Sequence, residues 1–325
     1  MNRRFAVIAL CAAAACAASH PSTVHAQTTR VIVPYPAGQL SDVIGRTVRE
    51  TLVRQTGGSA IVENVAGAGG AIGAQQLLNA SVGSDTLLLA SPNEVILAPL
   101  ANAAVKYRPE DFRLVALVAS APLVLLARAD LGVADADGFV EAARRSSRTQ
   151  PLSYGSVGIG SLYHLMGEQL SRAIGAELTH VPYKGGVPLL QDMAGGRIDF
   201  AMLPWSQALQ GMADQGRLRL LGTVATKRAT ALPNLPTVNE GRLLKDFSFD
   251  IWTGFAVHRD TPAAVRERWH RLLGAVLADP GVQSALEAQG LGLQKASTLA
   301  ELDAFYEREV ARFRRIAVES RLVPQ

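Results

Sequence analysis

Ser156, Ser161, His164 and Lys184 are the residues whose types could carry out catalysis. A serine activated by a histidine is a common nucleophile of hydrolases, and a lysine can hold a carboxylate. The sequence contains no G-x-S-x-G elbow, and Ser161 stands three residues before His164, where it can cap a helix instead. A secreted hydrolase or isomerase that uses Ser161, His164 and Lys184 remains an alternative hypothesis, and no catalytic residue is predicted.

Motifs for common cofactors and metals are absent from the sequence. The segment 67–72 reads GAGGAI, which lacks the last glycine of the dinucleotide fingerprint, and no Gly-Lys-Ser/Thr of a phosphate loop occurs. His164, His180, His258 and His270 are too widely spaced for a zinc site. We expect no cofactor and no bound metal.

Glycine-rich loops follow the predicted strands of the first half of the chain. The apolar run 31–33 leads into VPYPAG at 33–38, and a second strand at 60–64 leads into GAGG at 67–70. Such loops, followed by helix N-termini, hold anions with backbone amides. Asp42 stands at the start of the first helix and is interpreted as a capping carboxylate first, and as a ligand contact second.

The second half repeats this arrangement. A short strand at 152–154 leads into the glycine-rich loop 155–161, and VPYKGG at 181–186 echoes VPYPAG. The echo suggests that the two halves face each other with like ends. Lys184 in this loop could hold a ligand carboxylate or could simply be solvated.

Alternating strand and helix patterns place these loops in parallel βαβ units. Two lobes are predicted: residues 27–127 form the first part of lobe 1, residues 128–252 form lobe 2, and residues 253–325 return to lobe 1. The return begins on a strand predicted over 247–257.

The N-terminus predicts export. Arg3 and Arg4 precede an apolar run, and residues 1–26 read as a signal peptide cut near Ala26; a lipoprotein lipidated at Cys16 is a competing interpretation. Removing residues 1–26 removes both cysteines and leaves 30 basic residues, since the full chain has 32, against 28 acidic ones. This balance, without a Lys/Arg run among aromatics, gives no support to nucleic-acid binding.

Four segments together resemble a known family. They are VPYPAG followed by Asp42, ENVAGAGGAIGA at 63–74, YGSVGIGSLYHLMGE at 154–168 and HVPYKGGVPLLQDMAGGRID at 180–199. The mature chain is similar, over nearly its whole length, to the periplasmic substrate-binding receptors of tripartite tricarboxylate transporters, also called Bug-type receptors. The resemblance implies an α/β, two-lobed type II periplasmic binding protein fold with crossing hinge strands.

The resemblance also implies a function. The chain would be a periplasmic, non-enzymatic and monomeric receptor that closes around a small carboxylate and delivers it to a membrane permease or to a sensor. One ligand carboxylate would be held by the loops at 35–39 and 66–70, partly through water, and the second lobe would read the other end. The residues expected at the ligand are Tyr35, Pro36, Ala37, Gly38, Gln39, Asp42, Ala68, Gly69, Gly70, Ser91, Ser156, Gly158, Ile159, Ser161, His164, Tyr183, Lys184 and Trp205.

The sequence departs from the family pattern at several of these positions. Gln39 replaces a usual glycine, Val65-Ala66 replaces a usual Arg-Pro, and Ile159 replaces a common polar residue. Leu203-Pro204-Trp205 stands where many members have Asp-Asn before their Leu-Pro, so an acidic partner for a ligand ammonium is missing there. We therefore expect a carboxylate with an apolar or aromatic body rather than an amino acid.

Overall fold

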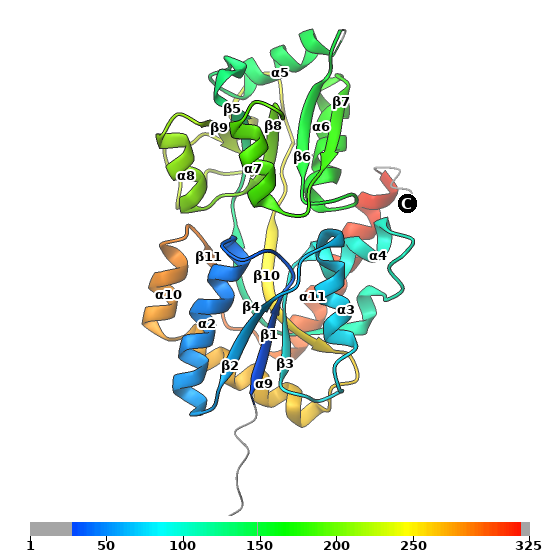
Figure 1. Cartoon of the computed structure of the whole chain (residues 1–325), viewed down its shortest axis with the longest axis vertical. Helices are drawn as coiled ribbons and strands as arrows, with labels where there is room; N and C mark the ends of the chain where they lie inside the picture. Colours follow the sequence, from blue (N-terminus) through cyan, green and yellow to red (C-terminus); the bar gives the residue numbers. More distant parts are fainter. Residues whose placement is uncertain (1–27, 148, 320–325) are drawn as a thin grey trace, which may run out of the picture.

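The chain forms two lobes, and each lobe is built on its own β-sheet (Figure 1). The computed structural model describes residues 28–147 and 149–319, so the predicted signal peptide and both cysteines lie outside the described residues. Among the helices of these two ranges, none is long and apolar enough to span a membrane.

Six strands form the mixed sheet of the first lobe. They are β1 (Thr29–Val33), β2 (Ala60–Asn64), β3 (Thr86–Ala90), β4 (Phe112–Ala121), β10 (Ile251–His258) and β11 (Gly292–Leu293). Their order is β11-β4-β10-β3-β1-β2. β1 is parallel to β2 and β3, whereas β10 is antiparallel to β3 and β4. All of β3 is buried, as expected for a central strand covered on both faces.

Helices cover both faces of this sheet (Figure 1). They are α2 (Leu40–Thr56), α3 (Ala71–Leu78), α4 (Ala98–Ala101), α9 (Ala263–Leu277), α10 (Pro280–Glu287) and α11 (Leu299–Glu319), with short turns η1 (Ala68–Gly70), η2 (Asn93–Leu97) and η3 (Pro109–Asp111). α2 shows the reason for this packing. Its buried Ile44, Val48 and Leu52 recur every four residues and form one apolar face.

Five strands form the sheet of the second lobe. They are β5 (Leu123–Arg128), β6 (Leu152–Ser156), β7 (Leu178–Pro182), β8 (Phe200–Pro204) and β9 (Leu218–Thr223), in the order β7-β6-β8-β5-β9. β6 is parallel to β7 and β8, and β5 is antiparallel to β8 and β9. The helices of this lobe are α5 (Ala136–Ser146), α6 (Leu162–Ile174), α7 (Gly186–Ala194) and α8 (Gln207–Asp214), with turns η4 (Ala129–Leu131) and η5 (Val238–Glu240).

The described chain crosses between the lobes twice. The first crossing lies at Pro122, between the end of β4 and the start of β5, and the second lies between β9 and β10. Val224, directly after β9, connects the two crossings: its amide donates to the Leu123 carbonyl at 2.7 Å, and its carbonyl accepts from the Phe249 amide at 3.1 Å. This pair of crossings forms the hinge.

The strand predicted over 247–257 begins later than expected, at Ile251. The Phe247 amide donates to the Asn239 side chain at 2.8 Å, and the rings of Phe247 and Phe249 pack edge to face. Local side-chain bonding therefore replaces the ladder in the segment 247–250, although its aromatic residues suit a strand.

Candidate functional site: a cavity between the lobes

A cavity of about 210 Å³ lies between the lobes and is lined by both. Most of its wall is apolar. The apolar side chains are Leu40, Val43, Ile44, Leu89, Ala90, Ala121, Val157, Val187, Leu190, Leu203, Pro204, Ala208, Leu209 and Ile251. A mostly apolar space of this kind, with polar groups in its wall, is typical of a site for a small organic ligand.

Two helices from opposite lobes begin at the cavity. Gln39, Leu40 and Ser41 at the start of α2 line it, as do Gly186 and Val187 at the start of α7. Neither N-cap residue, Gln39 nor Gly185, caps its helix with a side chain within the described structure. Because first-turn amides have no partner inside the helix, both ends can donate hydrogen bonds to an anion.

Gln39 joins these two helix ends. A Cβ placed on Gly185 would lie 2.6 Å from Gln39 Nε2, so the α2 loop and the α7 loop are in direct contact. Gln39 Nε2 is buried and has no hydrogen-bond partner among the described residues. A buried amide nitrogen without an acceptor is costly, which indicates a missing acceptor at this point of the cavity wall.

Asp42 holds the loop before α2. Its carboxylate accepts hydrogen bonds from the Gly38 amide at 3.0 Å, from Arg46 Nε at 2.9 Å and from Asn64 Nδ2 at 3.0 Å. Burial raises the pKa of Asp42, but these hydrogen bonds outweigh it and the net pKa is lowered. Asp42 does not line the cavity, so its carboxylate is used inside the first lobe.

Glu94 lies under Tyr35 at the cavity wall and is fully buried. One carboxylate oxygen accepts from the Tyr35 hydroxyl at 3.0 Å and from the Ser91 hydroxyl at 2.9 Å, and the other accepts from the Ser91 amide. Burial raises the pKa of Glu94 to about 7, even though these donors favour the charged form. The wall of the cavity thus holds one carboxyl group close to its titration point at neutral pH.

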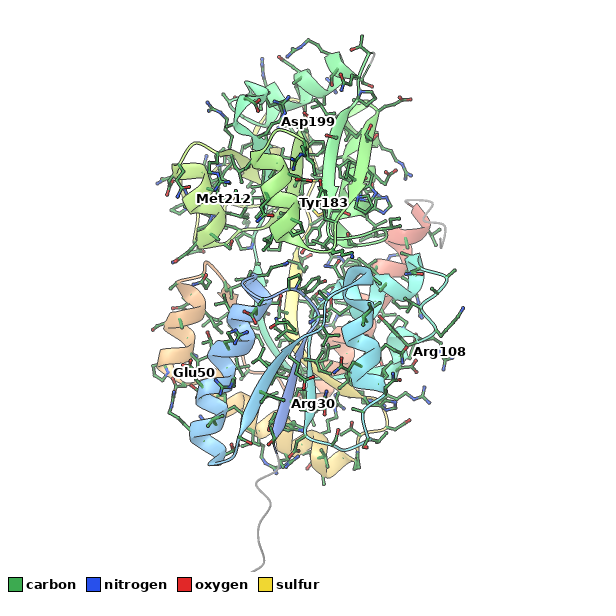
Figure 2. All side chains as sticks on the ribbon, in the orientation of Figure 1. Arg30, Glu50, Arg108, Tyr183, Asp199 and Met212 are labelled. Atoms are coloured by element: carbon green, nitrogen blue, oxygen red, sulfur yellow. The ribbon has the colours of Figure 1, made fainter. Side chains whose placement is uncertain are left out.

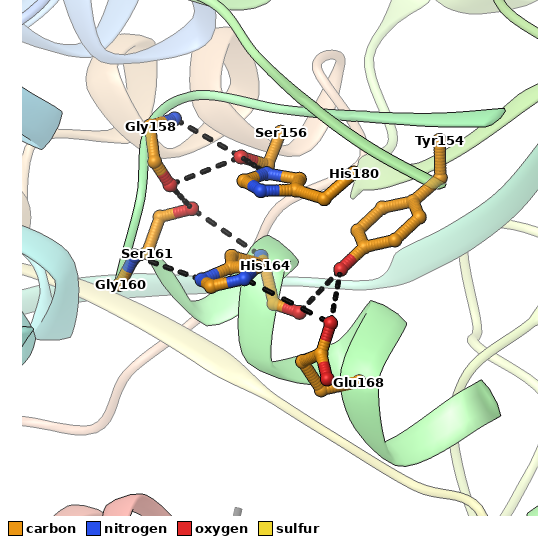
Figure 3. Close-up of polar contacts among 8 residues, drawn as sticks. All are labelled: Tyr154, Ser156, Gly158, Gly160, Ser161, His164, Glu168 and His180. Atoms are coloured by element: carbon orange, nitrogen blue, oxygen red, sulfur yellow. Dashed lines mark hydrogen bonds and ion pairs between the residues drawn. The ribbon is translucent and has the colours of Figure 1, made fainter. Parts of the chain in front are cut away.

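The loop 156–161 of the second lobe rests on a polar cluster (Figure 3). The imidazoles of His164 and His180 stack with centroids 4.0 Å apart. Ser156 Oγ lies 2.7 Å from His180 Nε2, and His164 Nδ1 accepts from the Gly160 amide at 3.0 Å. Burial lowers the pKa of both histidines, that of His180 to about 3, so both are neutral. The cluster orders the backbone of the loop.

The residues considered for catalysis do not meet at the cavity. Ser161 caps α6 and donates to the Gly158 carbonyl at 2.7 Å. The nitrogen of His164 that could act as a base already accepts from Gly160, and Lys184 is exposed. None of these three residues lines the cavity.

The loops of the two lobes touch along the closed cleft. A Cβ on Gly158 would lie 3.4 Å from the Gly69 amide nitrogen, and one on Gly160 would lie 1.7 Å from the Cβ of Ala101. The Leu162 amide, at the start of α6, donates to Asn93 Oδ1 at 2.8 Å. The structure is therefore a closed arrangement of the lobes.

On the far side of the cleft, Trp205 packs against the first lobe. A Cβ on Gly290 would lie 2.0 Å from its ring, and the neighbouring Gln207 donates to the Ala288 carbonyl. Trp205 thus holds the lobes together outside the cavity wall.

Only part of the predicted ligand set lines the cavity. Tyr35, Gly38, Gln39 and Ser91 line it. The remaining predicted residues do not line it: Pro36, Ala37, Asp42, Ala68, Gly69, Gly70, Ser156, Gly158, Ile159, Ser161, His164, Tyr183, Lys184 and Trp205. Tyr183, which Figure 2 places in the second lobe, donates from its hydroxyl to Asp192 at 2.9 Å.

Asn93, Glu94 and Tyr163 line the cavity and were not predicted. Asn93 and Glu94 follow Ser91-Pro92 directly, at the exit of β3. Binding residues gather at strand exits in open α/β sheets, so the sequence carries a signal for Asn93 and Glu94 two residues beyond Ser91-Pro92. In the described ranges, no three or more His, Cys, Asp or Glu residues form a group that could hold a metal.

Comparison with known proteins identifies the family. Residues 44–322 match the model of the tripartite tricarboxylate transporter family receptor. The UPF0065 protein of the TAR-I ttuE-ttuC′ intergenic region of Agrobacterium vitis is 33% identical over 98% of this chain and 92% of its own.

Two solved structures are similar throughout. The periplasmic binding protein BugD is 27% identical, with a TM-score of 0.83 over 92% of this chain and 99% of its own. Rpa4515 of R. palustris, solved with adipate, is 25% identical, with a TM-score of 0.83 over 94% of this chain and 100% of its own.

These matches confirm the resemblance drawn from the motifs, the periplasmic binding protein fold and the role of a carboxylate-binding receptor. The matched family and structures are substrate-binding receptors. The chain belongs to the tripartite tricarboxylate transporter receptor family.

Proposed function

We propose that this chain is a non-enzymatic receptor that captures a small carboxylate with an apolar body in the cavity between its lobes. The observation that carries the proposal is the convergence of the α2 and α7 N-termini, from opposite lobes, on a mostly apolar cavity. Amides at both helix ends hold the carboxylate, and the apolar wall surrounds the rest of the ligand. Rpa4515, which is similar throughout, was solved with the dicarboxylate adipate, and this supports a small carboxylate as the ligand class.

The proposed ligand contacts are those of the sequence prediction that line the cavity, Tyr35, Gly38, Gln39 and Ser91, together with Asn93, Glu94 and Tyr163. The other predicted residues act around the ligand by ordering loops and closing the cleft. Gln39 Nε2 donates to the ligand carboxylate, which supplies the acceptor that the amide lacks. The signal peptide 1–26 and the predicted division into 27–127, 128–252 and 253–325 stay part of the proposal. The two lobe boundaries move to Pro122 and Asp250, because β5 belongs to the sheet of the second lobe and β10 to that of the first.

The proposal includes export to the periplasm, a monomeric receptor, and delivery of the ligand to a tripartite-type permease or to a sensor. The absence of turnover is part of it as well. Two observations support this: Ser161 and His164 form hydrogen bonds within the loop before α6, and Lys184 is exposed and does not line the cavity.

A thermal-shift screen tests the ligand class. We expect aromatic or aliphatic monocarboxylates to raise the melting temperature of the purified protein, and aspartate and glutamate to leave it unchanged, because ligands that bind only the folded state stabilise it. Mass spectrometry of compounds that co-purify supplies natural candidates. Stabilisation by aspartate or glutamate alone would contradict the proposed ligand class. Recovery of the bound compound in altered form would contradict the proposed absence of turnover.

Gln39→Ala tests the site itself. We expect it to weaken carboxylate binding roughly tenfold, because a hydrogen bond to a charged group is lost. Gln75→Ala, on α3 and away from the cavity, is the matched control and should bind as the unchanged protein does. Equal affinity of the two variants in calorimetry would place the ligand away from Gln39.

A further inference from the structure

Glu94 is the one residue lining the cavity, within the described chain, that can carry a full charge near neutral pH. None of the described lining residues is Lys, Arg or His. A ligand with one carboxylate can use the amides of α2 and α7. A ligand with two carboxylates finds no cation for the second one.

The surroundings of Glu94 offer no compensating charge. The titratable groups that face it are the hydroxyls of Tyr35 after β1, Tyr107 before β4, Tyr163 on α6 and Tyr306 on α11, and burial raises the pKa of each. All four are neutral at ordinary pH. No Lys, Arg or His of the described residues forms an ion pair with Glu94.

Glu94 is also fixed in place. The Tyr107 hydroxyl donates to its backbone carbonyl at 2.5 Å, and Ser91 and Tyr35 hold both carboxylate oxygens. On the opposite side lies Gly70, where an added Cβ would be 2.8 Å from the Cβ of Glu94. The carboxyl group therefore cannot swing away when a ligand enters.

We propose that Glu94 is the specificity-determining residue of the cavity: it selects ligands with a single carboxylate on an apolar body and rejects dicarboxylates. The proposal rests on the proposed function and names the ligand class of the same site. Its physical basis is the repulsion between the buried Glu94 carboxylate and a second ligand carboxylate beside the apolar wall, where charge pairs interact more strongly than in water.

Proton uptake at Glu94 relaxes this selection. The raised pKa of Glu94 means that a modest fall in pH neutralises the group, and the repulsion then disappears. Rejection of dicarboxylates is therefore expected to be stronger at pH 8 than at pH 6.

Two matched ligand series test the proposal by calorimetry and thermal shift. Hexanoate, adipate and 6-aminohexanoate share one chain length, and 4-methylbenzoate, terephthalate and 4-(aminomethyl)benzoate share one ring. In each series the far end is a methyl, a second carboxylate or an ammonium. At pH 8 we expect the methyl compound of at least one series to bind at least tenfold more tightly than its dicarboxylate.

Glu94→Gln, which mimics the protonated acid, should reduce the ratio of monocarboxylate affinity to dicarboxylate affinity at least fivefold, because the dicarboxylate then binds more tightly. Glu63→Gln is the control, because Glu63 lies in the same lobe outside the cavity wall and pairs with Arg30. Far-ultraviolet circular dichroism checks the fold of each variant. A second measurement uses the unchanged protein alone. The affinity for terephthalate, which stays a dianion, should rise relative to the affinity for 4-methylbenzoate when the pH is lowered from 8 to 6.

Several outcomes would overturn the selection by Glu94. They are dicarboxylates that bind as well as the methyl compounds, a ratio unaffected by both Glu94→Gln and pH, or a preference for the ammonium compounds that Glu94→Gln abolishes. The last result would make Glu94 the partner of a ligand cation. In each of these cases carboxylates still bind, so the proposed function stands. Failure of all six compounds to bind would instead overturn the ligand class, and this proposal with it.

Discussion

Glu94 shows how one buried side chain links binding to folding. Its carboxyl group is fully buried without a cationic partner, and burial raises its pKa from 4.5 to about 7. Between these two pH values the folded protein binds more protons at this site than the unfolded chain does. The contribution of Glu94 to the free energy of unfolding is therefore fully present below pH 4.5. It falls by roughly 3 kcal/mol as pH rises to about 7.

Replacing Glu94 by Gln removes this dependence. The free energy of unfolding of Glu94→Gln, relative to that of the unchanged protein, is expected to grow between pH 5 and pH 8, and urea unfolding at both pH values measures it.

Glu63→Gln should show the opposite pH dependence of stability. The hydrogen bond from Arg30 lowers the pKa of Glu63, so its carboxylate stabilises the fold at neutral pH and its loss is felt more at pH 8 than near pH 4. If the free energy of unfolding changed with pH in the same way for the unchanged protein and both variants, the raised pKa of Glu94 and the lowered pKa of Glu63 would both be contradicted.

At the scale of the element, α6 brings the second lobe to the cleft. Ser161 caps its N-terminus, its first amide donates to Asn93 of the first lobe, and His164 stacks on His180 of β7. Gly167 lets the helix lie directly on the Tyr154 ring, since a Cβ there would be 2.1 Å from that ring. The position of the loop 156–161 depends on this close approach.

Gly167→Ala should therefore destabilise the protein by about 1–3 kcal/mol, because the ring and helix must separate. Gly274→Ala in α9 is the matched helical control, since among the described residues no atom beyond the nearby backbone of α9 lies within 4 Å of a Cβ placed there. It should be neutral or stabilising by up to about 1 kcal/mol, as expected for Gly to Ala inside a helix. Chemical unfolding measures both changes, and an equal effect of the two would exclude the packing argument.

At the scale of the whole molecule, the lobes close through glycine-mediated contacts at the rim of the cavity. Gly160 of the second lobe packs against Ala101 of α4 so closely that a Cβ on Gly160 would clash with the Ala101 side chain. The φ of Gly160 is +75°. Gly185 lies against Gln39 in the same manner on the other side of the loops. Closure around a ligand thus requires the backbone at Gly160 and Gly185 to contact side chains of the first lobe directly. A Cβ at either glycine would lie between the two lobes.

Gly160→Ala is expected to hold the lobes apart. Small-angle scattering should give a larger radius of gyration in the presence of saturating ligand, and affinity should fall at least tenfold because the closed state is penalised. Gly132→Ala is the control for the positive φ, which is +73° at Gly132, where an added Cβ meets no atom of the described residues within 4 Å. Closure and affinity of Gly132→Ala should match those of the unchanged protein. A compact, tight-binding Gly160→Ala would show that this contact does not limit closure.

Local patterns in the sequence determined the elements and the family. The strand runs 31–33 and 60–64 and the helix cap at Ser161 were predictable because hydrophobic period and capping act over a few residues. Tyr35, Gln39 and Ser91 stand in loops at strand exits and line the cavity, since parallel strands end at one edge of a sheet.

Only the tertiary structure decided which of these residues face the cavity. Asp42 is engaged by Gly38, Arg46 and Asn64, Lys184 is exposed, and Trp205 packs on Gly290, although all three stand in motifs that suggest ligand contact. The raised pKa of Glu94 likewise depends on elements distant in sequence that remove it from water. Burial and the lining of a cavity arise from long-range packing, which local sequence patterns do not encode.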